Sequence, residues 1–126
     1  MLTIRTQVKD SPGKGVGVFS LEKINKGDVV WVEHPLFYRI ITHFEFEQLP
    51  ELQKEFIKKH ATDYPNDKYF YLDLDDTRFL NHSYDPNIRW DKDKAFAIKD
   101  IEIGEEITVN YVELNPSDKE VVDNWK

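Results

Sequence analysis

The spacing of apolar side chains along the chain predicts a protein built mainly from short β-strands. Residues 2–8 alternate, so that Leu2, Ile4, Thr6 and Val8 share one face, and a period of two is typical of a half-buried strand. A turn is expected at residues 10–13. The same pattern predicts further strands at residues 28–41, interrupted at Pro35, and at residues 69–74, 95–98 and 107–111.

One stretch predicts helix instead. Thr42 and Glu45 have the spacing of a capping box, and Pro50 suits the first turn of a second helix. The side chains expected on the buried face of that helix are Leu49, Leu52 and Phe56. Lys58 and Lys59 fall near its C-terminal end, where the helix dipole favours positive charge.

Two segments repeat one shape. Residues 23–30 and 100–107 each read Ile, two residues, Gly, an acid, one residue and a β-branched residue. Two copies are too few for a solenoid, which needs at least three. The repeat therefore predicts two similar corners of one β-rich fold.

Composition narrows the classes of function. The chain has 126 residues, which suits a single domain over residues 1–126, and its net charge of −7 disfavours phosphate backbones and favours a basic peptide as partner. Cysteine is absent, which excludes disulfides and thiolate zinc sites and fits an intracellular location, cytoplasmic or nuclear in a host cell. No apolar run is long enough for a membrane span, so a membrane is not an expected partner. Because of the negative net charge, a nucleic acid is not expected either.

Isolated polar residues receive simpler interpretations. His43 and His60 lack neighbours at metal-ligand spacing and are expected at the surface, so no metal site is predicted. An acidic group at residues 73–76 resembles part of a calcium-binding loop, but no glycine or distal glutamate completes that loop. Its members are expected to be solvated charges: Asp73, Asp75 and Asp76.

Two motifs are candidates for binding chemistry. Glycines alternate in Gly15-Val16-Gly17-Val18-Phe19, which lets the backbone approach a ligand closely, although a flexible hairpin tip has the same composition. Residues 78–87, Arg-Phe-Leu-Asn-His-Ser-Tyr-Asp-Pro-Asn, put two apolar residues before a dense polar group. This loop is either a polar turn between strands or a ligand-binding loop anchored in the core by Phe79 and Leu80.

Together with Gly104-Glu105-Glu106-Ile107-Thr108-Val109-Asn110-Tyr111, these motifs resemble the SET-domain protein-lysine methyltransferases, in order and from about residue 3 to about residue 113. The length is similar to that of the minimal, free-standing SET domains of bacteria and viruses. The resemblance implies a mainly β, β-clip-like fold of small curved sheets with a helical insert at about residues 42–62. It also implies a knot-like crossing in which residues 78–87 lie against residues 105–111.

The same resemblance implies a function and a set of site residues. Members transfer methyl from S-adenosylmethionine (SAM) to a lysine side chain of a basic protein or peptide such as a histone tail. The residues implied to bind SAM are Lys14, Gly15, Val16, Gly17, Asn81 and His82. Tyr111 matches the catalytic tyrosine, and the substrate channel is expected to involve Tyr69 or Tyr71, Trp90 and Val109.

Departures from the family pattern leave alternatives open. Asn110 stands where many members have aspartate, and no cysteine-rich segment follows Tyr111 to form a zinc-bound lid. Residues 112–126 are expected to form the lid, unless a partner or the second subunit of a homodimer does so. The alternative functions are a catalytically silent SET fold that binds basic peptides and a methyltransferase for a non-protein amine.

Overall fold

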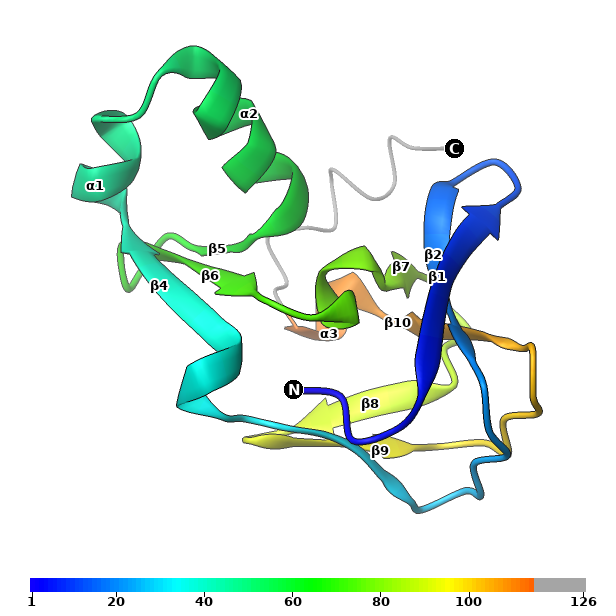
Figure 1. The fold of residues 1–126 in the computed structure, drawn as a ribbon. Coiled ribbons are helices and arrows are strands. Elements are labelled where there is room, and N and C mark those ends of the chain that lie inside the picture. Colours follow the sequence, from blue (N-terminus) through cyan, green and yellow to red (C-terminus); the bar gives the residue numbers. More distant parts are fainter. Residues whose placement is uncertain (115–126) are drawn as a thin grey trace.

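Within residues 1–114, which the computed structural model describes, ten short strands form three small sheets (Figure 1). The first sheet has the order β1-β2-β10-β7, the second β3-β9-β8 and the third β4-β6-β5. The mainly β class predicted from the sequence is confirmed. No helix in the described part is long and apolar enough to cross a membrane.

The first sheet begins with the hairpin of β1 (Thr6–Ser11) and β2 (Gly15–Ser20). Its turn closes through a 2.9 Å hydrogen bond from the Lys14 amide to the Ser11 carbonyl. The alternation predicted for residues 2–8 is present in the burial pattern, but the regular strand begins later and continues to Ser11. The predicted turn therefore starts two residues too early, because the hairpin ladder extends the strand.

The second sheet, of β3 (Val29–Val32), β9 (Lys94–Ala97) and β8 (Ile88–Asp91), lies next to the two predicted corners. These corners pair with each other, because Ile24 and Ile101 exchange backbone hydrogen bonds of 2.9 and 2.8 Å. Both isoleucines are buried in the larger of two hydrophobic clusters. The repeated shape thus serves to bring two distant turns together in one core.

The third sheet consists of β4 (Tyr38–Thr42), β6 (Tyr69–Asp73) and β5 (Thr62–Tyr64). The break predicted at Pro35 is present as a short 3₁₀ helix, η1 (Pro35–Phe37), between β3 and β4. Strand β5 was not predicted, since three residues give too short a pattern. It pairs antiparallel with β6 through a turn at residues 65–68.

Two helices, α1 (His43–Glu47) and α2 (Glu51–His60), form the insert between β4 and β5. The capping box of Thr42 and Glu45 is confirmed in both directions, whereas Pro50 occupies the N-cap rather than the first turn. Of the residues predicted on the buried face, Leu49 is half-buried against the second cluster, but the prediction is wrong for the other two. Leu52 and Phe56 are 70% and 45% exposed, and Ile57 is the helix residue that packs into the second cluster.

A 3₁₀ helix, η2 (Asp76–Phe79), leads into β7 (Asn81–His82), and β10 (Glu106–Val109) leads into the short helix α3 (Tyr111–Leu114). The strand predicted over residues 107–111 therefore ends at Val109, so Tyr111 begins a helix instead of continuing the strand face. The lid predicted for residues 112–126 falls mostly outside the described residues.

Candidate functional site

The segments of residues 78–87 and 105–111 lie against each other, as expected. Strand β7 runs parallel to β10, with Asn81 beside Thr108 and His82 beside Val109. Asn87 extends this contact, since its side-chain amide donates to the Glu106 carbonyl at 2.8 Å and its Oδ1 accepts from the Thr108 amide at 2.9 Å. The dense polar loop is thus a cross-linked core element, with Leu80 5% exposed at its base.

A hydrogen-bonded network joins this crossing to the glycine hairpin. The Asn81 amide nitrogen donates to the Val16 carbonyl at 2.9 Å and to Oε2 of Glu106 at 2.8 Å. The other oxygen of Glu106 accepts from the Ser11 hydroxyl at 2.8 Å. Glu106 of β10 therefore joins β1 and β7, and Asn81 extends the network to β2, a role that the sequence did not indicate.

Gly17 is the glycine that this network requires. A Cβ at this position would come within 2.5 Å of Glu106 Oε2 and 2.9 Å of Asn81 Nδ2. Gly15, by contrast, has a φ of +80° and nothing within 4 Å of an added Cβ. One glycine thus allows close packing and the other leaves open space beside the backbone.

His82 and Tyr111 contact each other at the start of α3. His82 Nδ1 accepts a hydrogen bond from the Tyr111 amide at 3.1 Å, and the two rings lie 5.4 Å apart between centroids. The Lys14 ammonium reaches the His82 carbonyl at 3.3 Å. Asn110, the departure from the family pattern, caps the turn that follows by accepting from the Val112 amide at 2.9 Å.

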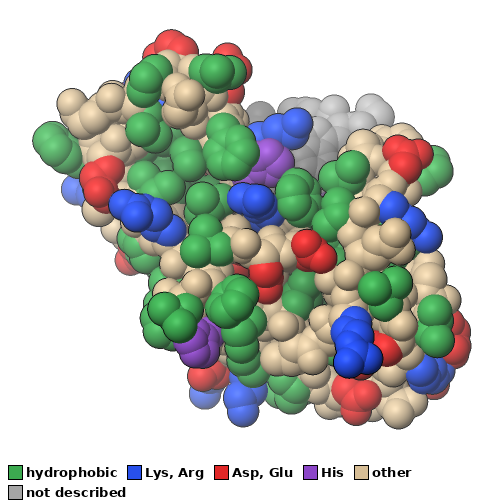
Figure 2. Space-filling model, viewed as in Figure 1, with side chains coloured by type: hydrophobic (Ala, Val, Ile, Leu, Met, Phe, Trp, Pro, Cys, Tyr) green, Lys and Arg blue, Asp and Glu red, His purple; other side chains and the backbone are tan. Residues whose placement is uncertain are grey.

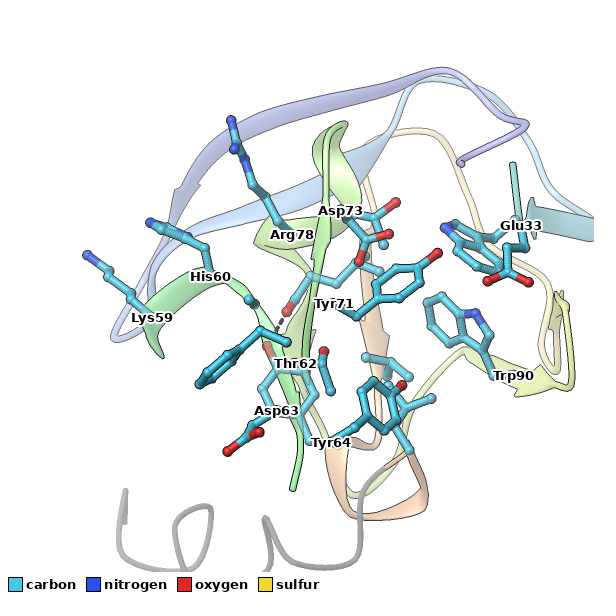
Figure 3. A pocket seen from close by; sticks show the side chains of 18 of the residues that line it. Glu33, Lys59, His60, Thr62, Asp63, Tyr64, Tyr71, Asp73, Arg78 and Trp90 are labelled. Carbon is cyan, nitrogen blue, oxygen red and sulfur yellow. Dashed lines mark hydrogen bonds between the residues drawn. The ribbon is translucent and has the colours of Figure 1, made fainter. Parts of the chain in front are cut away.

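A cavity of about 550 Å³ adjoins this crossing (Figure 3). Tyr111 lines it, and the Tyr111 hydroxyl donates a hydrogen bond to the Leu80 carbonyl. Strands β3, β5, β6, β8 and β10 and the end of α2 all contribute to the wall. The aromatic residues that line it are Trp31, Tyr64, Phe70, Tyr71, Trp90 and Tyr111.

One end of this cavity is acidic and poorly solvated. Burial and the nearby charge of Asp75 raise the pKa of Asp73 to about 7, and the N-terminal ammonium opposes this shift. Burial, Asp73 and Glu33 also raise the pKa of the Tyr71 hydroxyl. Glu33, Tyr71, Asp73 and Trp90 lie on one side in Figure 3, whereas Lys59, His60 and Arg78 lie on the other.

The prediction of solvated charge is therefore wrong for the acidic group of β6 and η2. Asp73 Oδ1 is buried and has no hydrogen-bond partner among residues 1–114. Asp75 accepts from the amides of Leu2 at 2.8 Å and Thr77 at 3.0 Å, so it ties the N-terminal segment to η2. Asp76 accepts from the Thr6 hydroxyl at 2.7 Å.

Both histidines predicted at the surface have specific neighbours. His43 lies 2.7 Å from Asp63 of β5. His60 lines the cavity and packs against Phe56 and Phe79, and its pKa is lowered by burial and by the charges of Lys59 and Arg78. Asp63 and Phe79 are distant from these histidines along the chain, so the sequence did not indicate either contact.

The predicted site residues separate into two groups that meet at Tyr111. Lys14, Gly15, Val16, Gly17, Asn81 and His82 belong to the hairpin and crossing side. Tyr71, Trp90 and Val109 line the cavity. Tyr69 does not line it within the described residues, and its ring lies against Tyr64 at 5.2 Å.

The family model described as SET domain matches residues 15–112. The chain belongs to the SET-domain family. This match covers β2 of the glycine hairpin and both strands of the crossing, β7 and β10. A search of curated proteins finds no significant match.

Solved structures with the same fold include histone-modifying enzymes. A humanized mutant of the Chaetomium thermophilum Polycomb Repressive Complex 2, bound to an inhibitor, is 25% identical with a TM-score of 0.61 over 86% of this SET domain. The same fungal complex in an autoinhibited conformation, bound to S-adenosylmethionine, is 25% identical with a TM-score of 0.62 over 96%. The SET domain spans only 15% and 17% of those chains.

Another solved structure is aligned with this chain over nearly its whole length. A Plasmodium falciparum protein described as a putative histone methyltransferase is 22% identical with a TM-score of 0.59, covering 87% of this chain and 95% of its own. At this identity the likeness establishes the fold alone.

Proposed function

We propose that this SET domain is a SAM-dependent protein-lysine N-methyltransferase acting on a basic protein or peptide such as a histone tail. The observation that carries the proposal is the position of Tyr111. Its ring and amide contact His82 on the hairpin side, while its hydroxyl bonds Leu80 at the wall of the aromatic cavity. A group held beside His82 and one held in the cavity would therefore meet at this tyrosine.

The hairpin side fits SAM by the chemistry of its residues. The Lys14 ammonium suits the carboxylate of the cofactor, and the open space at Gly15 allows backbone contact with a ligand. Asn81 and His82 are held in fixed orientations by Glu106 and by the Tyr111 amide. When bound, SAM supplies a methyl group on a cationic sulfur, so the protein contributes mainly by positioning.

The cavity side fits a lysine side chain. Free lysine has a pKa of about 10.4, and its amine must be neutral to attack the methyl group. An aromatic wall with Tyr71 and Trp90 disfavours the ammonium by desolvation while still attracting a cation as it enters. Tyr111, fixed through its bond to the Leu80 carbonyl, can orient the amine by accepting a hydrogen bond from it.

Two other functions are tested by the same experiment. A silent SET fold would bind basic peptides without turnover, and a methyltransferase for a non-protein amine would ignore peptides. We propose to incubate the chain with labelled SAM, a panel of lysine peptides and small amines, and to locate the label by mass spectrometry. Label on peptide lysines supports the proposal, whereas peptide binding without label, or label on small amines alone, contradicts it.

Tyr111→Phe tests the residue that carries the proposal. The change removes one hydroxyl, and a loss of turnover of about 10²-fold or more is expected for a positioned catalytic group. Tyr69→Phe is the matched control, because Tyr69 lies outside the cavity lining, and it should lose far less. Near-wild-type turnover in Tyr111→Phe, with the variant folded, would show that this hydroxyl has no part in the reaction.

A further inference from the structure

The acidic end of the cavity contains polar atoms that the fold itself does not satisfy. Asp73 Oδ1, the Tyr71 hydroxyl and the Trp31 indole nitrogen are all buried without a hydrogen-bond partner in residues 1–114. Trp31 is only 5% exposed, and all three side chains line the cavity. Buried polar groups are normally paired, so this set points to a ligand that supplies both donors and acceptors.

Aromatic rings enclose these atoms and favour a cation. Trp31 and Trp90 meet edge to face at 5.2 Å, and Tyr71 is stacked on Tyr38 at 4.6 Å. The second carboxylate at this end belongs to Glu33, which is exposed and whose amide donates to the Asp93 carbonyl at 2.9 Å. Two carboxylates beside such rings form an environment suited to a basic side chain.

A metal ion is a poorer match to this chemistry. No group of three or more metal-ligating side chains occurs in the described part of the chain, and an indole N–H cannot ligate a metal. A peptide carries partners for the whole set, because a basic side chain can donate to Asp73 and backbone carbonyls can accept from the Trp31 indole and the Tyr71 hydroxyl. The two opposite ends of the cavity also differ in charge, since the cations Lys59 and Arg78 line the other side (Figure 3).

We propose that Glu33 and Asp73, walled by Trp31, Tyr71 and Trp90, form a specificity subsite for a second basic side chain of the substrate. This inference rests on the proposed methyltransferase function for the identity of its ligand. It narrows the substrate class from lysine peptides in general to those with another basic residue near the target lysine. The basic side of the cavity disfavours the same residue at the opposite flank.

The protonation of Asp73 makes the subsite sensitive to pH. The pKa of Asp73 is raised to about 7 by burial and by Asp75, and lowered in part by the Met1 ammonium. Tyr71 and Glu33 line the same cavity, as do Lys92 and Asp93 of the turn between β8 and β9. The carboxyl is thus largely ionised at pH 8 and largely neutral at pH 6, so selection for a basic side chain should weaken as the pH falls.

Peptide binding provides the direct test. The parent peptide has one lysine and neutral flanks, and its derivatives place arginine singly at each of the three positions on either side. Binding to the full chain is followed by tryptophan fluorescence, since two of the three tryptophans, Trp31 and Trp90, line the cavity. Arginine at one position should lower Kd and KM by about tenfold at pH 8, because a hydrogen bond to a charged group is gained.

Variants assign this preference to the subsite. Asp73→Asn and Glu33→Gln should bring the ratio of arginine to parent Kd towards one, whereas Glu55→Gln, which removes an exposed charge on α2, should keep it. Glu33→Lys should instead favour a peptide with glutamate at the selected position, and its exposed site makes misfolding no concern.

The outcomes separate this inference from the proposed function. Equal Kd values for all peptides, or a preference that survives in both Asp73→Asn and Glu33→Gln, would overturn the subsite. Methylation of lysine without any such preference would overturn the subsite and leave the proposed function standing. A clear preference in Kd without methyl transfer would support the subsite and refute the proposed function.

Discussion

Replacing Asp73 by asparagine should stabilise the fold most at high pH. The folded protein holds the proton of Asp73 up to a pKa of about 7, whereas the ordinary value is 3.8. A group with a raised folded pKa contributes stability that is fully present below its unfolded pKa and is lost as the pH rises through the folded one. Wild type should therefore lose stability from about pH 4 to about pH 7 through this residue.

The size of the effect follows from the two pKa values. Between pH 5 and pH 7 the unfolded chain is ionised at this carboxyl while the folded chain largely retains the proton. Each pH unit in that window corresponds to 1.36 kcal/mol, so about 2.5 kcal/mol of stability is at stake. Asp73→Asn cannot ionise and should gain that amount relative to wild type between pH 5 and pH 8.

Urea unfolding at several pH values measures this difference directly. Comparing the two proteins at each pH removes the contribution of His60, whose lowered pKa acts in the opposite direction. Asp67→Asn, in the exposed turn before β6, is the control that loses the same charge without burial. A constant stability difference between Asp73→Asn and wild type from pH 5 to pH 8 would show that Asp73 titrates normally, and would refute the reasoning.

Two further predictions concern the network around Glu106. Gly17→Ala should weaken SAM binding and destabilise the fold, because its Cβ would come within 2.5 Å of Glu106 Oε2. Gly13→Ala is the control, because nothing lies within 4 Å of its added Cβ and only the cost of a positive φ applies. SAM affinity is measured by calorimetry and stability by thermal unfolding, and equal losses in the two variants would contradict the clash. Asn81→Ala should cost about 1–3 kcal/mol in urea unfolding and weaken SAM binding, because it removes the donor to Val16 and Glu106; a wild-type midpoint and affinity would disprove this.

The features of the fold that depend on residues close together in the sequence were predicted well. The capping box at Thr42 needs only residues within one turn, and the paired corners at Ile24 and Ile101 were recognisable by their common shape. The prediction of the buried face of α2 failed for Leu52 and Phe56 because apolar residues occur on more than one face of this helix. Packing against Phe46 and Phe70 selected the Ile57 face, and periodicity could not indicate that choice.

The candidate site was predictable only as far as motifs extend. The motifs were sufficient to predict Asn81 and Tyr111 as site residues. The raised pKa of Asp73 depends on burial beside Asp75, and no short-range sequence pattern indicates which residues bury a carboxyl group. The exposed apolar residues of the insert, visible over α1 and α2 in Figure 2, were equally unpredictable. They include Phe44, Leu52 and Phe56.

The charge polarity of the cavity connects local stability with the proposed function. Lys58 and Lys59 end α2, where the helix dipole favours positive charge, and this placement was predictable from the sequence. Because α2 ends at the cavity, the same two lysines also help to make one of its sides basic. The acidic side comes from Glu33 and Asp73, which lie at or beyond the ends of β3 and β6. Lysines that stabilise the end of a helix therefore also help to orient a charged substrate in the cavity. Their position opposite the two carboxylates depends on the assembled fold.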